Sequence, residues 1–318
     1  MIAQNDGTYI KTTTVACPLC GAVEYSPLAA GPDFDHRTSR DEFHIVRCRP
    51  CGVLYLNPRP DVSELNRIYP VEYGAYHFNE PVLTFRLRNY LEQRKVRLLL
   101  RLLPGSADLL DVGCGGAGFL ERLRKFGSRG WRLWGNEINP DVLADLSRRG
   151  FKTLPGKFEE LDQPECSFDA IIFKQVLEHF ESPRDALRRA ARLLRPGGVA
   201  VIETPNCGAW DARLFRRRYW AGYCIPRHWT VFDPRTLSRL SEEEGLAVES
   251  LTFLPSPSFW TESVRNMFMD KGWPPVVYRR FTNRSTVAMG LATMLDLLQK
   301  LVTGRTSNMR AILRKPAR

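Results

Sequence analysis

Two cysteine pairs near the start of the chain have the spacing of a metal site. "CPLCG" contains Cys17 and Cys20, and "CRPCG" contains Cys48 and Cys51. Each C-x-x-C segment can turn two thiolates to one side, and two such pairs supply the four ligands of a tetrahedral site. Because protein thiolates would fill all four positions, the pattern predicts structural zinc rather than a catalytic metal. Disulfides, or an iron ion bound by the same thiolates, are the alternatives.

A second chemical signal is the glycine-rich segment "DVGCGGAGFL" at residues 111–120. Gly113, Gly115 and Gly118 fit G-x-G-x-x-G, in which glycines allow the backbone to approach a ligand closely. Glu137 follows about twenty residues later, at the distance where an acidic side chain accepts hydrogen bonds from ribose hydroxyls. The glycine pattern alone suits a dinucleotide and any other adenosine-containing cofactor equally.

These residues belong to a regular alternation of strand and helix signals that begins near residue 105. Three helices are predicted to begin at a capping residue followed by proline, at Asn139, Ser182 and Asp233. The alternation predicts an α/β fold with a parallel sheet covered by helices on both faces. The predicted strands are 108–113, 131–138, 168–175, 199–204, 246–254 and 307–316.

Composition and periodicity divide the chain into three regions. Residues 1–60 are rich in Pro, Gly and Cys, and we expect them to form a small zinc-ribbon-like module. Residues 61–104 are predicted to form a helical connector, and residues 105–318 the main domain. An insertion at 256–304 interrupts the alternation with prolines and a weakly charged apolar helix.

The segment "FDAIIFKQVLEHFESPRDALRRAARLLRPGGVAVIETPN", residues 168–206, closely resembles the fourth and fifth strands of class I S-adenosylmethionine-dependent methyltransferases. "DVGCGGAGFL" resembles the first motif of that family, and "LWGNEINP" resembles the second. The resemblance covers about 105–255. It implies a Rossmann-like, doubly wound, seven-stranded sheet whose last two strands form an antiparallel hairpin around the 256–304 insertion. It also implies S-adenosylmethionine as the cofactor.

The resemblance implies a set of residues that contact the cofactor. The glycine loop would line the aminocarboxylate and ribose, and Glu137 would accept hydrogen bonds from both ribose hydroxyls. Phe158 and Glu159 would border the adenine ring, although a plain core aromatic is the alternative for Phe158. The complete expected set is Asp111, Gly113, Gly115, Gly118, Phe119, Glu137, Ile138, Phe158, Glu159, Lys174, Gln175 and Val176.

Methyl transfer requires an aligned acceptor and, for a hydroxyl or a carbon acid, a base that removes its proton. His179 in "VLEHF" and His228 in "IPRHWTVF" stand where the family places acceptor-side residues, and Tyr76 belongs to a similar "Y-x-Y-H" run. Structural roles are the alternatives for all three. Arg227 stands where the sugar C-methyltransferases have Glu, which favours O-methylation. Gln175 replaces the first carboxylate of a Glu-x-x-Glu-His magnesium motif, which disfavours a catalytic metal.

A zinc-knuckle N-terminus on this core resembles bacterial enzymes of sugar, polysaccharide and natural-product tailoring. We therefore expect O-methylation of a sugar-type acceptor, nucleotide- or lipid-linked, or of a natural product. Sugar C-methylation and a non-catalytic cofactor-binding role are alternatives. Nucleic-acid methylation is a further alternative, but the chain has neither an Asn-Pro-Pro-type motif nor a Pro-Cys pair for cytosine.

The formal net charge of +11 has two interpretations. Solvated helix faces explain it, and so does attraction to anionic partners. The run Arg216–Arg218 is predicted either to bind a phosphate or diphosphate of the acceptor or to form a solvated basic turn. The apolar helix with basic residues at 276–302 is predicted either to contact a membrane surface or to pack against the core. The sequence shows no signal-peptide pattern, so we expect a cytoplasmic protein, with peripheral contact at the inner membrane face.

Overall fold

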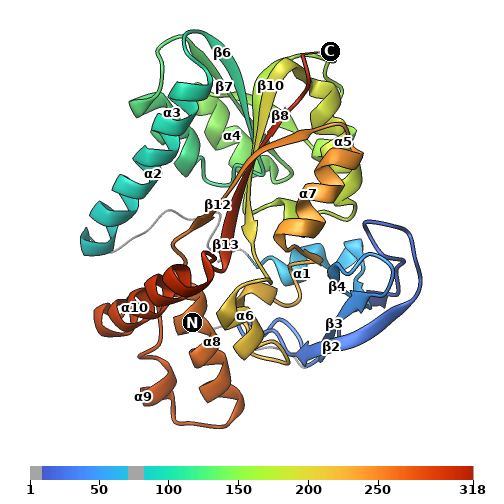
Figure 1. Cartoon of the computed structure of the whole chain (residues 1–318), viewed down its shortest axis with the longest axis vertical. Helices are drawn as coiled ribbons and strands as arrows, with labels where there is room; N and C mark the ends of the chain where they lie inside the picture. Colours follow the sequence, from blue (N-terminus) through green and yellow to red (C-terminus); the bar gives the residue numbers. More distant parts are fainter. Residues whose placement is uncertain (1–8, 71–81, 318) are drawn as a thin grey trace.

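The computed structural model describes residues 9–70 and 82–317. Its principal sheet has seven strands in the order β12-β13-β10-β9-β6-β7-β8 (Figure 1). Six of these strands point in the same direction, and β13 runs antiparallel between β10 and β12. The strands are β6 (Ala107–Val112), β7 (Trp131–Glu137), β8 (Lys152–Pro155), β9 (Phe168–Lys174), β10 (Leu194–Pro205), β12 (Ala247–Leu254) and β13 (Asn308–Arg314). The predicted fold class and the antiparallel β12–β13 pair are confirmed.

The chain reverses direction across the sheet between β6 and β9. It first proceeds from β6 through β7 to β8, and then returns to the other side of β6 with β9. Ligands of open α/β sheets bind at the carboxyl ends of the strands at such a switch point. The glycine loop follows β6 and therefore stands at this point.

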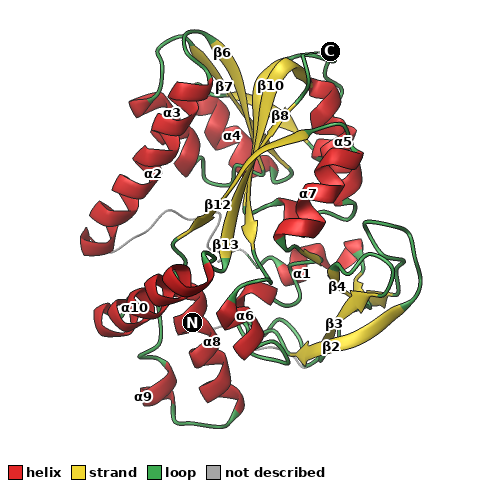
Figure 2. Cartoon of the chain, viewed as in Figure 1, coloured by secondary structure: helices red, strands yellow, loops and turns green. Residues whose placement is uncertain are grey.

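Helices cover both faces of the sheet (Figure 2). The predicted caps form: the side chains of Asn139, Ser182 and Asp233 accept hydrogen bonds from backbone N–H groups of the first turn, and proline follows each. Apolar stripes on these helices pack against the sheet in two clusters of buried residues, one on each face. The helices are α2 (Val82–Leu102), α3 (Gly118–Phe126), α4 (Pro140–Arg148), α5 (Pro183–Leu193) and α7 (Pro234–Glu243).

The N-terminal region forms its own small sheets. β1 (Thr12–Thr13) pairs with β5 (Arg59–Pro60), and a second sheet has the order β11-β4-β3-β2. Its outer strand β11 (Thr230–Val231) comes from the main domain, so this sheet joins segments that lie far apart in the sequence. The other strands are β2 (Tyr25–Gly31), β3 (Phe43–Cys48) and β4 (Leu54–Leu56), and the short helices η1 (Val62–Glu64) and α1 (Leu65–Ile68) follow the module.

The interval between β12 and β13 is helical. It contains α8 (Pro257–Asp270), α9 (Pro275–Tyr278) and α10 (Thr286–Thr303), which lie together near α6 (Trp210–Leu214) at one end of the molecule (Figure 1). Short 3-10 turns complete the fold: η2 (Phe158–Glu160), η3 (Leu177–His179) and η4 (Ala221–Tyr223). Among the described helices, none has the length and apolarity that a membrane span requires.

Candidate active site

The glycine loop lies against the segment that follows β9. Gly113 has a φ of +60°, a conformation that side chains with a Cβ adopt at a cost. A Cβ at this position would lie 2.5 Å from Val176 Cγ2, so the close contact between loop and segment requires glycine. Among the described residues, no side chain caps the N-terminus of α3, which follows the loop. Its first N–H groups are therefore available to a ligand.

Glu137 ends β7 with its carboxylate turned toward the glycine loop. Its Oε2 accepts a hydrogen bond from Gly115 N–H at 3.1 Å, and its Oε1 accepts from Ile138 N–H at 2.8 Å. The side chain is buried and fixed by its own backbone surroundings. This rigidity suits a residue that must present a carboxylate to a ligand in one orientation.

A buried network of charges surrounds the end of β9. Lys174 Nζ lies 3.1 Å from Glu92 of α2, and Lys95 bridges Glu92 at 2.8 Å and Glu203 at 2.7 Å. Asp111 is buried in β6, and burial raises its pKa to about 7. A cationic ligand next to Asp111 would favour the ionised carboxylate, which is the condition for tight ion pairing.

Two groups contact the Nδ1 atom of His179 and orient its ring. Its Nδ1 lies 3.0 Å from the carbonyl oxygen of Arg227 and 2.9 Å from Tyr69 Oη. Because a carbonyl only accepts, the first contact assigns the proton to Nδ1 and leaves the lone pair on Nε2. Burial and the neighbouring His228 hold the pKa of His179 well below its ordinary value, so the ring is neutral near pH 7. A neutral imidazole with Nε2 unprotonated is a competent proton acceptor.

His228 stacks edge-on against His179, with ring centroids 4.6 Å apart. Its Nδ1 donates to the carbonyl of Gly222 at 2.9 Å, and its Nε2 lies 4.0 Å from Glu178 Oε1. Burial lowers the pKa of His228 to about 4 and raises that of Glu178 to about 8. Both residues are therefore mostly uncharged near neutral pH. Within the described residues, neither carboxyl oxygen of Glu178 has a hydrogen-bond partner.

Comparison with known proteins identifies the family. A family profile described as "Methyltransferase domain" matches residues 86–251, just over half of the chain, from α2 to β12. The matched range includes the glycine loop, Glu137 and His179. The chain belongs to the class I S-adenosylmethionine-dependent methyltransferases.

Individual relatives of this methyltransferase agree with that assignment. The chain is 27% identical over 169 residues to a ubiquinone biosynthesis O-methyltransferase of Bradyrhizobium diazoefficiens, covering 52% of this chain and 62% of the relative. The chain is 32% identical over 102 residues to the ubiquinone biosynthesis O-methyltransferase of Maricaulis maris, and this alignment covers 31% of this chain and 40% of the relative. The chain therefore spans less than two thirds of these curated relatives.

A solved structure shares the fold. The 1,6-didemethyltoxoflavin-N1-methyltransferase of Burkholderia thailandensis superimposes with a TM-score of 0.50 at 17% identity, covering 86% of this chain and 96% of that one. At this identity the likeness concerns the fold alone.

Several predicted cofactor residues of the methyltransferase have structural partners. Gln175 Nε2 donates to Asn308 Oδ1 at 3.0 Å, and its backbone has a φ of +55°. Phe158 is 2% exposed and packs edge-on against Phe173, in agreement with the alternative of a core aromatic. Ile138, in contrast, is 58% exposed beside Glu137. Of the remaining predicted residues, Gly118 and Phe119 begin α3, and Glu159 lies half-buried in η2.

Sequence reasoning missed Tyr69 and Asp33. Tyr76, which we predicted for the acceptor side, lies outside the described residues, whereas Tyr69 contacts His179 directly. Asp33 forms an ion pair with Arg227 at 2.7 Å, and both side chains are fully buried. No local pattern marks either contact, because the partners are 110 and 194 residues apart in the sequence.

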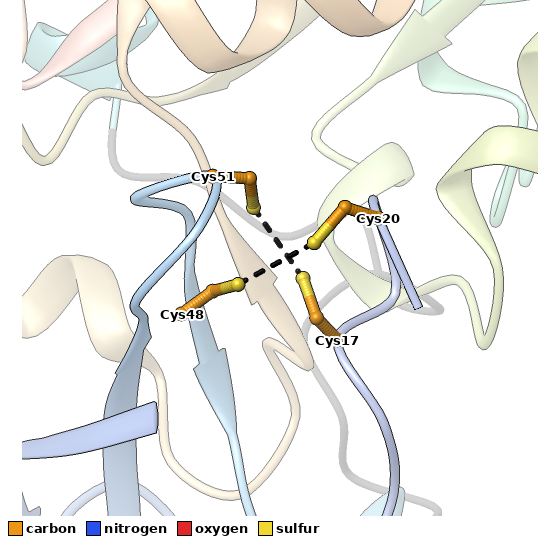
Figure 3. A group of neighbouring side chains, drawn as sticks. All are labelled: Cys17, Cys20, Cys48 and Cys51. Carbon is orange, nitrogen blue, oxygen red and sulfur yellow. Dashed lines mark hydrogen bonds between the residues drawn. The ribbon is translucent and has the colours of Figure 1, made fainter. Parts of the chain in front are cut away.

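The four predicted cysteines of the methyltransferase converge (Figure 3). The Sγ atoms of Cys17 and Cys51 lie 3.5 Å apart, as do those of Cys20 and Cys48, and all four lie within 4.8 Å of one another. All four are free thiols, so the disulfide alternative does not describe this structure. A second group that could hold a metal ion is Glu178, His179 and His228.

Proposed function

We propose that this methyltransferase transfers a methyl group from S-adenosylmethionine to a hydroxyl group of a sugar-type or natural-product acceptor. The observation that carries the proposal is the position of His179. The N–H group of His179 donates to the carbonyl of Val176 at 3.0 Å, and Gly113 of the glycine loop packs closely against the Val176 side chain. A neutral base therefore begins one turn after the residue that packs against the loop on which the methyl donor would lie.

In this proposal the glycine loop and Glu137 hold the cofactor. Glu137 accepts hydrogen bonds from the ribose hydroxyls, since a carboxylate has more lone pairs than its backbone contacts occupy. The exposed side chain of Ile138 supports the adenine ring. Asp111 is buried in β6 just before the glycine loop, and a positively charged cofactor bound there would draw its carboxyl toward the ionised form.

His179 acts as the general base. The acceptor hydroxyl gives its proton to Nε2 while its oxygen forms a bond to the methyl carbon, and the carbon–sulfur bond breaks. S-adenosylmethionine would supply the methyl group and leave as a neutral thioether, and His179 would hold the released proton and its positive charge. Tyr69 and the Arg227 carbonyl hold the ring in the orientation that exposes Nε2. His228 serves as a positioning residue behind it.

The acceptor class rests on three supports. The curated relatives are named as O-methyltransferases, which agrees with transfer to oxygen. Arg227 stands where the sugar C-methyltransferases have Glu, and the nearby carboxylate of Asp33 is buried in an ion pair with Arg227, so neither residue offers a free carboxylate for C-methylation. Arg216 and Arg217 line an open groove with His44, which suits a phosphate-bearing acceptor. Arg218 does not contribute, because Asp270 and Glu42 occupy its guanidinium.

We also propose that Cys17, Cys20, Cys48 and Cys51 bind one structural zinc ion. Zn–S bonds of about 2.3 Å in a tetrahedron separate the sulfurs by about 3.8 Å. The two measured Sγ–Sγ distances of 3.5 Å are close to that value. All four positions belong to cysteines, so this ion would stabilise the module and leave no position for a substrate.

Calorimetry with S-adenosylhomocysteine tests the cofactor site. We expect the wild type to bind, Glu137→Ala to lose at least tenfold in affinity, and the control Glu165→Ala, an exposed carboxylate on a loop, to bind like the wild type. Absence of binding by the wild type, or unchanged binding by Glu137→Ala, would refute the cofactor assignment.

Methyl transfer to a panel of acceptors tests the base. The panel contains nucleotide sugars, free sugars and catechols, since the relatives are named for ubiquinone biosynthesis. We expect His179→Asn to retain S-adenosylhomocysteine binding and to lower kcat on the order of a hundredfold or more. Wild-type kcat/KM should fall in acid only below pH 6.5, because the pKa of His179 is lowered. Full activity of His179→Asn would exclude it as the base.

A further inference from the structure

Helix α10 packs through a face of small and polar residues. The residues that it buries are Ala288, Ala292, Asp296 and Gln299, which recur every three or four positions and therefore share one face. Asp296 accepts a hydrogen bond from Ser256 N–H at 2.9 Å, and Gln299 accepts from Asp211 N–H at 2.9 Å. Helices that only cover a core bury their apolar stripe instead. Because α10 is attached through this face, most of its large apolar side chains are left exposed.

The opposite side of α10 is apolar and exposed. Leu301 is 84% exposed and Val287 75%, and the exposed set extends along the whole helix. Isolated apolar side chains on a surface are ordinary, but a contiguous set marks an interaction surface. We call this set the α10 apolar face: Val287, Leu291, Met294, Leu295, Leu297, Leu298, Leu301 and Val302.

Positive charge is concentrated along the chain on both sides of α10. From residue 271 to residue 305 the sequence contains six cations and a single carboxylate, Asp296, which is buried against Ser256. Within residues 9–70 and 82–317 none of the six cations forms an ion pair with a carboxylate. They are exposed and unneutralised: Lys271, Arg279, Arg280, Arg284, Lys300 and Arg305.

We infer that the α10 apolar face and its bordering cations bind the surface of an anionic phospholipid bilayer. The helix would lie in the plane of the interface, with its leucines at the acyl boundary and the arginines at the lipid phosphates. A second copy of the chain fits less well, because it would place the same six cations against one another. The inference goes beyond the proposed reaction and does not depend on which acceptor is methylated.

Vesicle flotation of the full-length protein tests this inference. The probes are vesicles of phosphatidylcholine alone and vesicles of phosphatidylcholine mixed with phosphatidylglycerol. We expect binding to the anionic vesicles, weaker binding at high salt, and little binding to the neutral vesicles. The double variant Leu291→Asp/Leu298→Asp should lose at least tenfold in partition. The triple variant Arg279→Ser/Arg280→Ser/Arg284→Ser should lose about a hundredfold, at about fivefold for each charge near the surface.

Matched controls separate the surface from general effects of charge and apolarity. Val23→Asp replaces an apolar residue that is 70% exposed on the N-terminal module. Arg129→Ser/Arg192→Ser/Arg235→Ser removes the same charge from exposed positions outside the 256–304 insertion. Both controls should bind anionic vesicles at close to the wild-type level. Thermal unfolding and S-adenosylhomocysteine binding check that each variant folds. If Leu291→Asp/Leu298→Asp does not fold, the single variant Leu298→Ser takes its place.

Three results would overturn the inference. The first is a wild type that binds no vesicles, and the second is equal partition of the α10 variants and their controls. The third is a concentration-dependent dimer that Leu291→Asp/Leu298→Asp dissociates while no variant binds lipid, because the face would then be an interface between copies. Methyl transfer to a water-soluble acceptor should be unchanged in the α10 variants. A failure of the proposed reaction is therefore distinguishable from a failure of lipid binding.

Discussion

Arg227→Met should destabilise this protein far more than the loss of an ordinary surface arginine. The guanidinium of Arg227 donates to both oxygens of Asp33, at 3.0 and 2.7 Å, and also to the carbonyl of Ile68. Both side chains are fully buried, and the pair joins the N-terminal module to the loop that carries His228. Although burial opposes ionisation, the hydrogen bond from Arg227 keeps the pKa of Asp33 below its ordinary value.

The magnitude follows from what the variant leaves behind. Removing one partner of a buried pair costs about 3–5 kcal/mol, because the other charge stays buried without compensation. Asp33 keeps hydrogen bonds from the N–H groups of Asp35, His36 and Thr38, which places the expected loss toward the lower end. The double variant Asp33→Asn/Arg227→Met removes both charges. It should therefore cost less than the sum of the two single variants, by about 2 kcal/mol or more.

Urea unfolding followed by circular dichroism measures these free energies of unfolding. Arg148→Met is the matched control, since Arg148 pairs with Asp145 at 3.4 Å and its side chain is 77% exposed. Such a surface pair contributes at most about 1 kcal/mol. Equal losses for Arg227→Met and Arg148→Met, or strict additivity in the double variant, would refute the reasoning.

Three further predictions concern the site and the module. Burial raises the pKa of Glu178 to about 8 from 4.5, so between these pH values the folded state holds a proton that the unfolded chain releases. The contribution of Glu178 to stability should therefore fall as the pH rises through this range, by about 5 kcal/mol at about 1.4 kcal/mol per pH unit. Glu178→Gln should flatten this slope in thermal unfolding against pH, and parallel curves would contradict the burial. Metal analysis should find one zinc ion per chain of the wild type. The control Cys166→Ser, which removes an exposed thiol, should retain the zinc, whereas Cys20→Ser should lose it and have a lower Tm. Equal zinc contents of Cys20→Ser and Cys166→Ser would exclude the four-cysteine site. Gly113→Ala should weaken S-adenosylhomocysteine binding because its Cβ would lie 2.5 Å from Val176 Cγ2, and adding Val176→Ala should restore part of the affinity; no restoration would show that this contact is not the cause.

Local signals in the sequence were sufficient for much of the fold. Asn139, Ser182 and Asp233 cap their helices because the capping side chain and the following proline act within a single turn. The glycine loop and the paired cysteines are likewise short-range patterns whose chemistry requires those residue types. The alternation of strands and helices then leaves few arrangements other than a doubly wound sheet.

The residues that surround His179 could not be predicted from such local patterns. Tyr69 reaches it from the end of α1, and the Arg227 carbonyl from a loop beyond β10. Each contact depends on how distant segments pack, and no periodicity or spacing encodes that packing. The same holds for the buried pair of Asp33 and Arg227, and for β11, which joins the sheet of the N-terminal module.

The sequence by itself predicted the fold class, the cysteine cluster and the glycine loop, because each appears as a pattern of residue types only a few positions apart. Tertiary structure alone decided which side of α10 is buried and which groups orient His179. For α10 the composition shows an apolar helix, but hydrogen bonds of Asp296 and Gln299 to distant segments turn its leucines outward. Burial also set the protonation of Glu178 and His228, since a pKa depends on the solvent that the whole fold excludes.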